Sequence, residues 1–168
     1  MRAVIRDIDV AIGPWIRAFP HRIRTTSRLK YAYRNGRCAV FALALHLELG
    51  YRIDASFNAG LEDAETEEDC LVHVFCVAPD GLWYDVGGRI TLQWMKDRMA
   101  FWDPEDGEGS CWIDQNLSDG ELQALIESTV GEPYPGEVEA LRRLIRANPE
   151  LYGAGAQPQG DVGELRAG

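Results

Sequence analysis

Residues 38–49 read CAVFALALHLEL, and this stretch decides the fold of the chain. Alanine and leucine favour helix, and the glycine that commonly ends a helix follows as Gly50. Apolar side chains surround this helix on nearly every side, since only His46 and Glu48 are polar. A helix of this kind belongs inside a core rather than on its surface. The stretch therefore predicts a central, buried helix that begins at Cys38.

The second strong pattern is LVHVFCV at residues 71–77, which is rich in β-branched and apolar side chains on both faces. Such a run predicts an interior strand. Residues 79–81 read Pro-Asp-Gly and indicate a turn, because proline presets its first position and glycine supplies the left-handed one. Residues 83–86 are the expected return strand.

The turn also predicts how the two strands are aligned. A Pro-Asp-Gly loop of three residues pairs Ala78 with Leu82. In that register His73 and Asp85 share one face of the hairpin as diagonal neighbours, with their side chains within reach of each other. Trp83 falls on the same face. A two-residue loop would place His73 and Asp85 on opposite faces.

Two helices are expected nearer the C-terminus. Ser118 begins a capping box ahead of a helix over residues 122–130, and residues 137–147 carry apolar side chains at helical spacing. A chain of 168 residues is long enough for one substantial core. We therefore expect a single α+β domain over residues 1–152, in which the buried helix packs on a small antiparallel sheet with C-terminal helices, and a flexible tail over residues 153–168.

Cys38 lies where a reactive thiol would be favoured. At a helix N-terminus the unpaired backbone N–H groups and the helix dipole stabilise an anion, and Arg34 and Arg37 add positive charge nearby in the sequence. These features lower the pKa of a thiol from about 8.5. The same amides are suited to an oxyanion. The residues that we assign to substrate or oxyanion binding are Asn35, Gly36, Arg37 and Trp83.

A thiolate enzyme also needs a base, and the base needs an acceptor that orients it. His46 lies eight residues further along the same helix, roughly 12 Å from Cys38, and is too distant. Nothing in the sequence argues for or against His21. His73 remains, with Asp85 as its partner on the hairpin. The residues thus predict Cys38 as nucleophile, His73 as base and Asp85 as the orienting carboxylate.

The segments that carry these residues resemble a known superfamily. RNGRC at residues 34–38, HV at residues 73–74 and YDVG at residues 84–87 resemble papain-like thiol enzymes, in particular the transglutaminase-like and arylamine N-acetyltransferase-like branches, and also small uncharacterised phage and bacterial proteins. The resemblance covers about residues 34–90. It implies a papain-like fold and a Cys-His-Asp triad in this chain order. The glutamine that papain-type peptidases place shortly before the cysteine is absent from this sequence.

The net charge of −10 is unevenly distributed. Residues 1–37 carry +7, residues 38–139 carry −18 and residues 140–168 carry +1. An acidic body disfavours nucleic acid as the main partner and suits a cationic substrate or an amine acceptor. The basic segment leaves nucleic-acid contact as a minor alternative, through Arg22, Arg24, Arg28 and Lys30.

Several other classes of protein are not expected. The cysteines at positions 38, 70, 76 and 111 form no Cys-x-x-Cys pair, so we expect free thiols and no metal site. The longest apolar run, residues 39–45, has seven residues and is too short to span a membrane. Charges within residues 1–7 interrupt any signal region, which indicates a cytoplasmic protein. No cofactor is expected.

The sequence therefore predicts a cysteine-dependent acyl-transfer enzyme that acts on a protein or on a small amide or amine substrate. Whether water or an amine accepts the acyl group, as in an amidase or peptidase or as in a transglutaminase, stays open. The alternative hypothesis is a non-catalytic acidic interaction or inhibitor protein on a papain-like scaffold, for instance one encoded by a phage. Taken singly, a buried cysteine or a strand histidine more often belongs to a core than to an active site.

Overall fold

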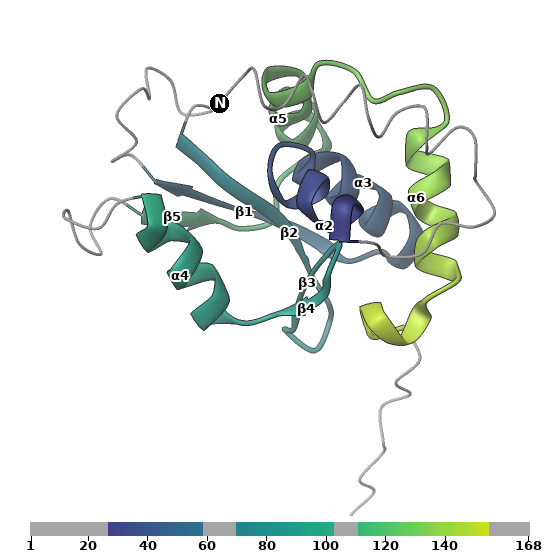
Figure 1. Ribbon diagram of the computed structural model, residues 1–168, viewed down its shortest axis with the longest axis horizontal. Coiled ribbons are helices and arrows are strands. Elements are labelled where there is room, and N and C mark those ends of the chain that lie inside the picture. Colours follow the sequence, from purple (N-terminus) through teal and green to yellow (C-terminus); the bar gives the residue numbers. More distant parts are fainter. Residues whose placement is uncertain (1–26, 59–69, 103–110, 155–168) are drawn as a thin grey trace, which may run out of the picture.

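The structure is a computed structural model, and it describes residues 27–58, 70–102 and 111–154 (Figure 1). These segments contain both helices and strands. In chain order the elements are α2 (Ser27–Arg34), α3 (Cys38–Leu49), β1 (Arg52–Asn58), β2 (Leu71–Val77), β3 (Trp83–Asp85), β4 (Gly88–Ile90), α4 (Leu92–Trp102), β5 (Cys111–Asp114), α5 (Asp119–Val130), α6 (Glu137–Arg146) and a 3-10 helix, η3 (Pro149–Tyr152).

The strands form one five-stranded sheet with the order β4-β3-β2-β1-β5, and every neighbouring pair is antiparallel. The predicted α+β class is therefore confirmed, and β2 is an interior strand as expected. The sequence patterns had not singled out α2, β1, β4, α4 or β5. Of these, β1 is the least visible in sequence because it buries polar side chains, namely Asp54, Ser56 and Asn58.

Helix α3 lies over one face of the sheet and is the centre of the main core (Figure 1). Seven of its side chains are buried, and the packed cluster around them includes residues of the sheet, α5 and α6. The helix ends as the sequence predicts, because Gly50 has a left-handed φ of 69° and its N–H donates to the carbonyl oxygen of His46 at 2.8 Å. Helix α4 covers the opposite face, where Met95 packs in a second cluster with Phe75 and Val77.

The predicted hairpin register is present between β2 and β3. The N–H of Ala78 donates to the carbonyl oxygen of Leu82 at 2.9 Å, and Val77 pairs with Trp83 in the adjoining strands. This register brings His73 and Asp85 to the same part of the sheet. The register of β2 therefore follows from turn chemistry that is readable in the sequence.

The C-terminal elements pack closely against the rest of the fold. Ser118 forms the predicted capping box at the start of α5, and α6 begins at Glu137. Tyr152 in η3 is fully buried, and its hydroxyl donates to the carbonyl oxygen of Val86 at 3.3 Å. Of the predicted tail, residues 155–168 lie outside the described residues.

Candidate active site

Cys38 is the first residue of α3 and is 6% exposed. The first helical hydrogen bond runs from the N–H of Phe41 to the carbonyl oxygen of Arg37 at 3.2 Å. Helical bonding therefore leaves the amides of residues 38–40 unused. Burial opposes the thiolate, but the neighbouring His73 ring and its charge outweigh it, so that the pKa of Cys38 is lower than that of an ordinary thiol. A backbone hydrogen bond from Val74 and the charge of Arg98 act in the same direction.

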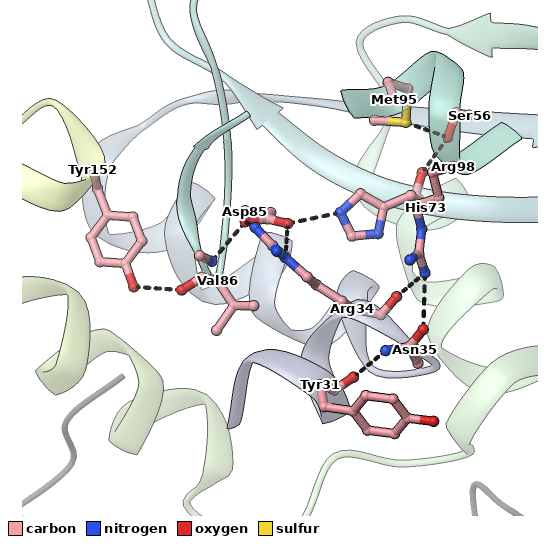
Figure 2. Close-up of polar contacts among 11 residues, drawn as sticks. Tyr31, Arg34, Asn35, Ser56, His73, Asp85, Val86, Met95, Arg98 and Tyr152 are labelled. Carbon is pink, nitrogen blue, oxygen red and sulfur yellow. Dashed lines mark hydrogen bonds and ion pairs between the residues drawn. The ribbon is translucent and has the colours of Figure 1, made fainter. Parts of the chain in front are cut away.

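His73 in β2 lies fully buried between Cys38 and Asp85. Its Nε2 atom is 3.4 Å from Oδ2 of Asp85 (Figure 2). Nε2 therefore faces the carboxylate, and neither buried ring nitrogen makes a hydrogen bond within the described residues. Burial opposes the imidazolium, but the neighbouring Asp85 carboxylate and Cys38 thiol prevail and raise the pKa of His73. The three groups therefore favour an imidazolium beside a thiolate.

Asp85, at the end of β3, is fixed by three further donors. Arg34 forms two parallel hydrogen bonds with the carboxylate, from Nε to Oδ2 at 2.7 Å and from Nη2 to Oδ1 at 2.9 Å, and the N–H of Gly87 donates to Oδ1 at 2.6 Å (Figure 2). Burial opposes ionisation, but His73 and Arg34 outweigh it and lower the pKa of Asp85 to about 2. A Cβ atom on Gly87 would lie 2.1 Å from Nη2 of Arg34, so this close approach requires glycine.

Trp94 in α4 packs against the cationic residues of the site and was not predicted from the sequence. Its ring meets His73 edge-on, with centroids 5.3 Å apart. The guanidinium carbon of Arg34 lies 4.8 Å from the Trp94 ring centroid, and that of Arg98 lies 5.6 Å away. Trp94 and Arg98 are four residues apart and so share one face of α4. That spacing is readable in the sequence, but nothing local indicates that this face covers His73.

Arg37 has a different environment from the one expected. Its guanidinium is buried and pairs with Glu137 of α6, from Nε to Oε1 at 2.8 Å and from Nη2 to Oε2 at 2.5 Å, and it stacks on the Tyr134 ring at 4.5 Å. The Tyr33 hydroxyl donates to the same carboxylate at 2.5 Å. The Arg37 side chain is thus committed to holding α6 against the start of α3. His73 and Arg98, not Arg37, are the cations that lower the pKa of Cys38.

The other residues assigned to substrate or oxyanion binding differ in their placement. Asn35 belongs to the turn between α2 and α3, where its Nδ2 donates to the carbonyl oxygen of Tyr31 at 2.7 Å. Gly36 in the same turn has a φ of 130°, which favours glycine. Trp83 is half-buried and packs on Phe75 with ring centroids 4.8 Å apart, in the apolar cluster under α4.

The remaining histidine and cysteine candidates lie elsewhere. His46 contacts the carbonyl oxygen of Tyr51 through Nδ1 at 2.6 Å. Cys76 points into the main core, where burial raises the pKa of its thiol and Sγ donates to the carbonyl oxygen of Ala42 at 3.4 Å. No disulfide joins any of the four cysteines. His21 lies outside the described residues.

Of the basic residues considered for nucleic acid, Arg28 and Lys30 belong to α2, and Arg22 and Arg24 lie outside the described residues. Within the described segments, no group of three or more His, Cys, Asp or Glu side chains is placed to hold a metal ion. No helix in those segments has the length and apolar character that crossing a membrane requires.

Comparison of the chain with protein-family models, curated proteins and solved structures finds no match.

Asp85→Asn is expected to remove a pH-dependent part of the stability. The pKa of Asp85 is about 2 in the fold, against about 4 for an unpaired aspartate. Because the fold lowers the pKa of this carboxyl group, its ionised form stabilises the fold by about 2 kcal/mol at pH values above the pKa in the unfolded chain. This stabilisation is lost as the pH falls through the lower pKa in the folded protein. In urea unfolding, the deficit of the variant relative to wild type should be largest near neutrality and narrow towards pH 2.

The exposed carboxylate of Asp97 on α4 provides the control. Asp97→Asn is expected to change the free energy of unfolding by less than about 0.5 kcal/mol. A deficit in Asp85→Asn that stays constant between neutral and acid pH would show that the ionised carboxylate is not what stabilises this site.

Proposed function

We propose that this protein is a cysteine-dependent acyl-transfer enzyme in which Cys38 is the nucleophile, His73 the base and Asp85 the residue that orients the base. One observation carries the proposal: the buried ring of His73 has its Nε2 atom 3.4 Å from the Asp85 carboxylate and favours ionisation of the Cys38 thiol, which lies at the N-terminus of a buried helix. This is the arrangement that thiol nucleophiles require. It also accords with the resemblance of the sequence to papain-like thiol enzymes.

In the proposed reaction the Cys38 thiolate attacks an amide or ester carbonyl carbon, and a C–S bond forms. The carbonyl oxygen becomes an oxyanion beside the unused amides of residues 38–40. The His73 imidazolium gives its proton to the leaving amine or alcohol as the bond to that group breaks. The result is a thioester on Cys38, with His73 neutral.

In the second step water or an amine attacks the thioester. Neutral His73 takes the proton from this acceptor, the C–S bond breaks, and the electron pair returns to sulfur as the thiolate. Asp85 stays ionised throughout because its pKa of about 2 is far below neutrality. It holds Nε2 of His73 so that Nδ1 exchanges the proton with the reacting groups.

One observation favours the alternative of a non-catalytic protein on a similar scaffold. The three triad side chains are nearly or fully buried, with exposures of 6% for Cys38, 0% for His73 and 3% for Asp85. A group that never meets a substrate can be buried in this way. The two functions differ in one measurable property, which is the reactivity of the thiol in the folded protein.

The test is alkylation of the folded protein by iodoacetamide across pH, with the labelled cysteines identified by peptide mapping. We expect Cys38 to label with an apparent pKa below that of an ordinary thiol and faster at mildly acidic pH than the half-buried Cys111. His73→Ala should raise that pKa and slow Cys38 at least about tenfold, since one pKa unit is a tenfold change in thiolate fraction.

His46→Ala is the matched control, because it removes the other described histidine without touching Cys38. Labelling of Cys38 in this variant should equal that of wild type. Uniformly slow labelling of Cys38 in the folded wild-type protein, with no effect of His73→Ala, would contradict the proposed enzyme and favour the non-catalytic alternative.

A further inference from the structure

Arg98 of α4 reaches the turn that leads into Cys38. Its Nη2 atom donates to the carbonyl oxygen of Arg34 and, at 3.4 Å, to Oδ1 of Asn35 (Figure 2). Its guanidinium carbon also lies 5.6 Å from the ring centroid of Trp94, which contacts His73. A positive charge from the helix on the opposite face of the sheet is therefore held at residues that lie three and four positions before Cys38 in the sequence.

This charge has no carboxylate of its own. No ion pair among the described residues includes Arg98, and its Nε atom is buried without a hydrogen-bond partner. The nearby acid, Asp85, is already bound by Arg34, His73 and the N–H of Gly87. Partly burying a guanidinium is unfavourable unless an anion compensates its charge.

The Cys38 thiolate is the remaining anion at this place. The charge of Arg98 favours the ionised thiol, and in return the thiolate and Asp85 favour the guanidinium, while burial and the neighbouring Arg34 disfavour it. The charged groups around Cys38 are thus His73 of β2, Asp85 of β3, Arg98 of α4 and Arg34 of α2. Two guanidiniums and an imidazolium face one carboxylate and the thiolate.

We propose that Arg98 is a positioning residue of the Cys38 site: its guanidinium fixes the turn before Cys38, stabilises the thiolate by charge, and makes the site prefer electrophiles that carry a negative charge. The inference rests on the proposed function and deepens it by naming a substrate class. It reverses the expectation of a cationic substrate, which followed from the net charge of −10. The charge next to the sulfur acts over a shorter distance than the charge of the whole body, so it governs the reacting electrophile.

The test compares two alkylating agents that differ in charge, iodoacetate and iodoacetamide. Both react with the thiolate, so the ratio of their rate constants at Cys38 reports the local charge independently of the thiolate fraction. In Arg98→Gln we expect this ratio to fall about three- to tenfold and the apparent pKa of Cys38 to rise. In Arg98→Lys, which keeps the charge, the ratio should stay close to that of wild type.

Lys96→Gln is the matched control, because it removes an exposed cation from the same helix. It should leave both the ratio and the pKa unchanged. A merely structural role of Arg98 would slow both reagents together and leave their ratio unaltered. If Arg98→Gln does not fold, Arg98→Met, which keeps the apolar stem, replaces it. In wild type the ratio of the iodoacetate rate constant to the iodoacetamide rate constant should be higher for the folded than for the urea-unfolded protein.

Two outcomes separate this inference from the proposed function. If Cys38 of wild type has a lowered pKa that depends on His73, but Arg98→Gln or Arg98→Met leaves the ratio unchanged, the role of Arg98 is overturned and the thiol enzyme stands. If Cys38 of wild type labels only as slowly as an ordinary buried thiol, both are overturned.

Discussion

Cys38→Ala is expected to abolish acylation of the protein by an activated ester such as p-nitrophenyl acetate. Wild type should release a burst of p-nitrophenol equivalent to one acyl group per chain, and the acyl group should be found on Cys38. Removing an enzyme's nucleophile lowers kcat by a factor on the order of 10⁶ in a well-studied serine protease. The burst should therefore disappear, because the variant lacks the sulfur to which the acyl group bonds.

Cys111→Ala is the control for this experiment. Cys111 is free and half-buried at the start of β5, away from His73 in the sheet order, so its removal should leave the burst amplitude unchanged. The folded state of each variant is checked by circular dichroism. A burst of equal size in Cys38→Ala would contradict the assignment of the nucleophile, and a burst that moves to another cysteine would relocate it.

Glu137→Leu should cause the largest loss of stability. Glu137 is 1% exposed and is the partner of the buried Arg37 guanidinium, and it also accepts hydrogen bonds from the Tyr33 hydroxyl and the Tyr134 N–H. The substitution leaves Arg37 buried without its counter-charge, which costs about 3–5 kcal/mol. Because a domain is typically stable by only about 5–15 kcal/mol, much of the stability is lost. Urea or thermal unfolding measures the change.

Two further variants test the reason for that loss. Arg142→Ala, in the same helix, breaks a half-exposed pair with Glu48 and should cost less than about 1 kcal/mol. The double variant Arg37→Leu/Glu137→Leu removes both charges and should recover most of the lost stability, since apolar pairs often replace buried ion pairs without penalty. A double variant as unstable as Glu137→Leu alone would show that the uncompensated charge is not the cause.

The elements with strong local patterns could be predicted from the sequence. Helix α3 begins and ends where its apolar composition and Gly50 place it, and β2 is interior, as its apolar side chains on both faces indicate. Strand β1 could not be predicted in the same way. Its buried Asp54 accepts hydrogen bonds from Arg52 in the same strand and from the N–H of Asn116, and the second partner, 62 residues away, is not visible in the local pattern.

The candidate site likewise has one part that could be predicted from local sequence patterns and another part that could not. The neighbouring positions of His73 and Asp85 follow from the Pro-Asp-Gly turn, because a short loop fixes the register of the strands that it joins. The role of Arg34 as the bidentate partner of Asp85 was not foreseen, although its charge had been noted. Trp94 and Arg98 were missed altogether, because they reach the site only through the packing of α4 on the sheet.

The sequence by itself determined the buried helix with Cys38 at its start, the hairpin register and the Cys-His-Asp order, since these depend on composition, caps and turns over short distances. Only the tertiary structure decided which charges meet. It paired Arg37 with Glu137, a hundred residues away, paired Arg34 with Asp85, and placed Arg98 against the turn that precedes Cys38. Electrostatic pairing depends on distance in space and on burial, and neither quantity is encoded by neighbours along the chain.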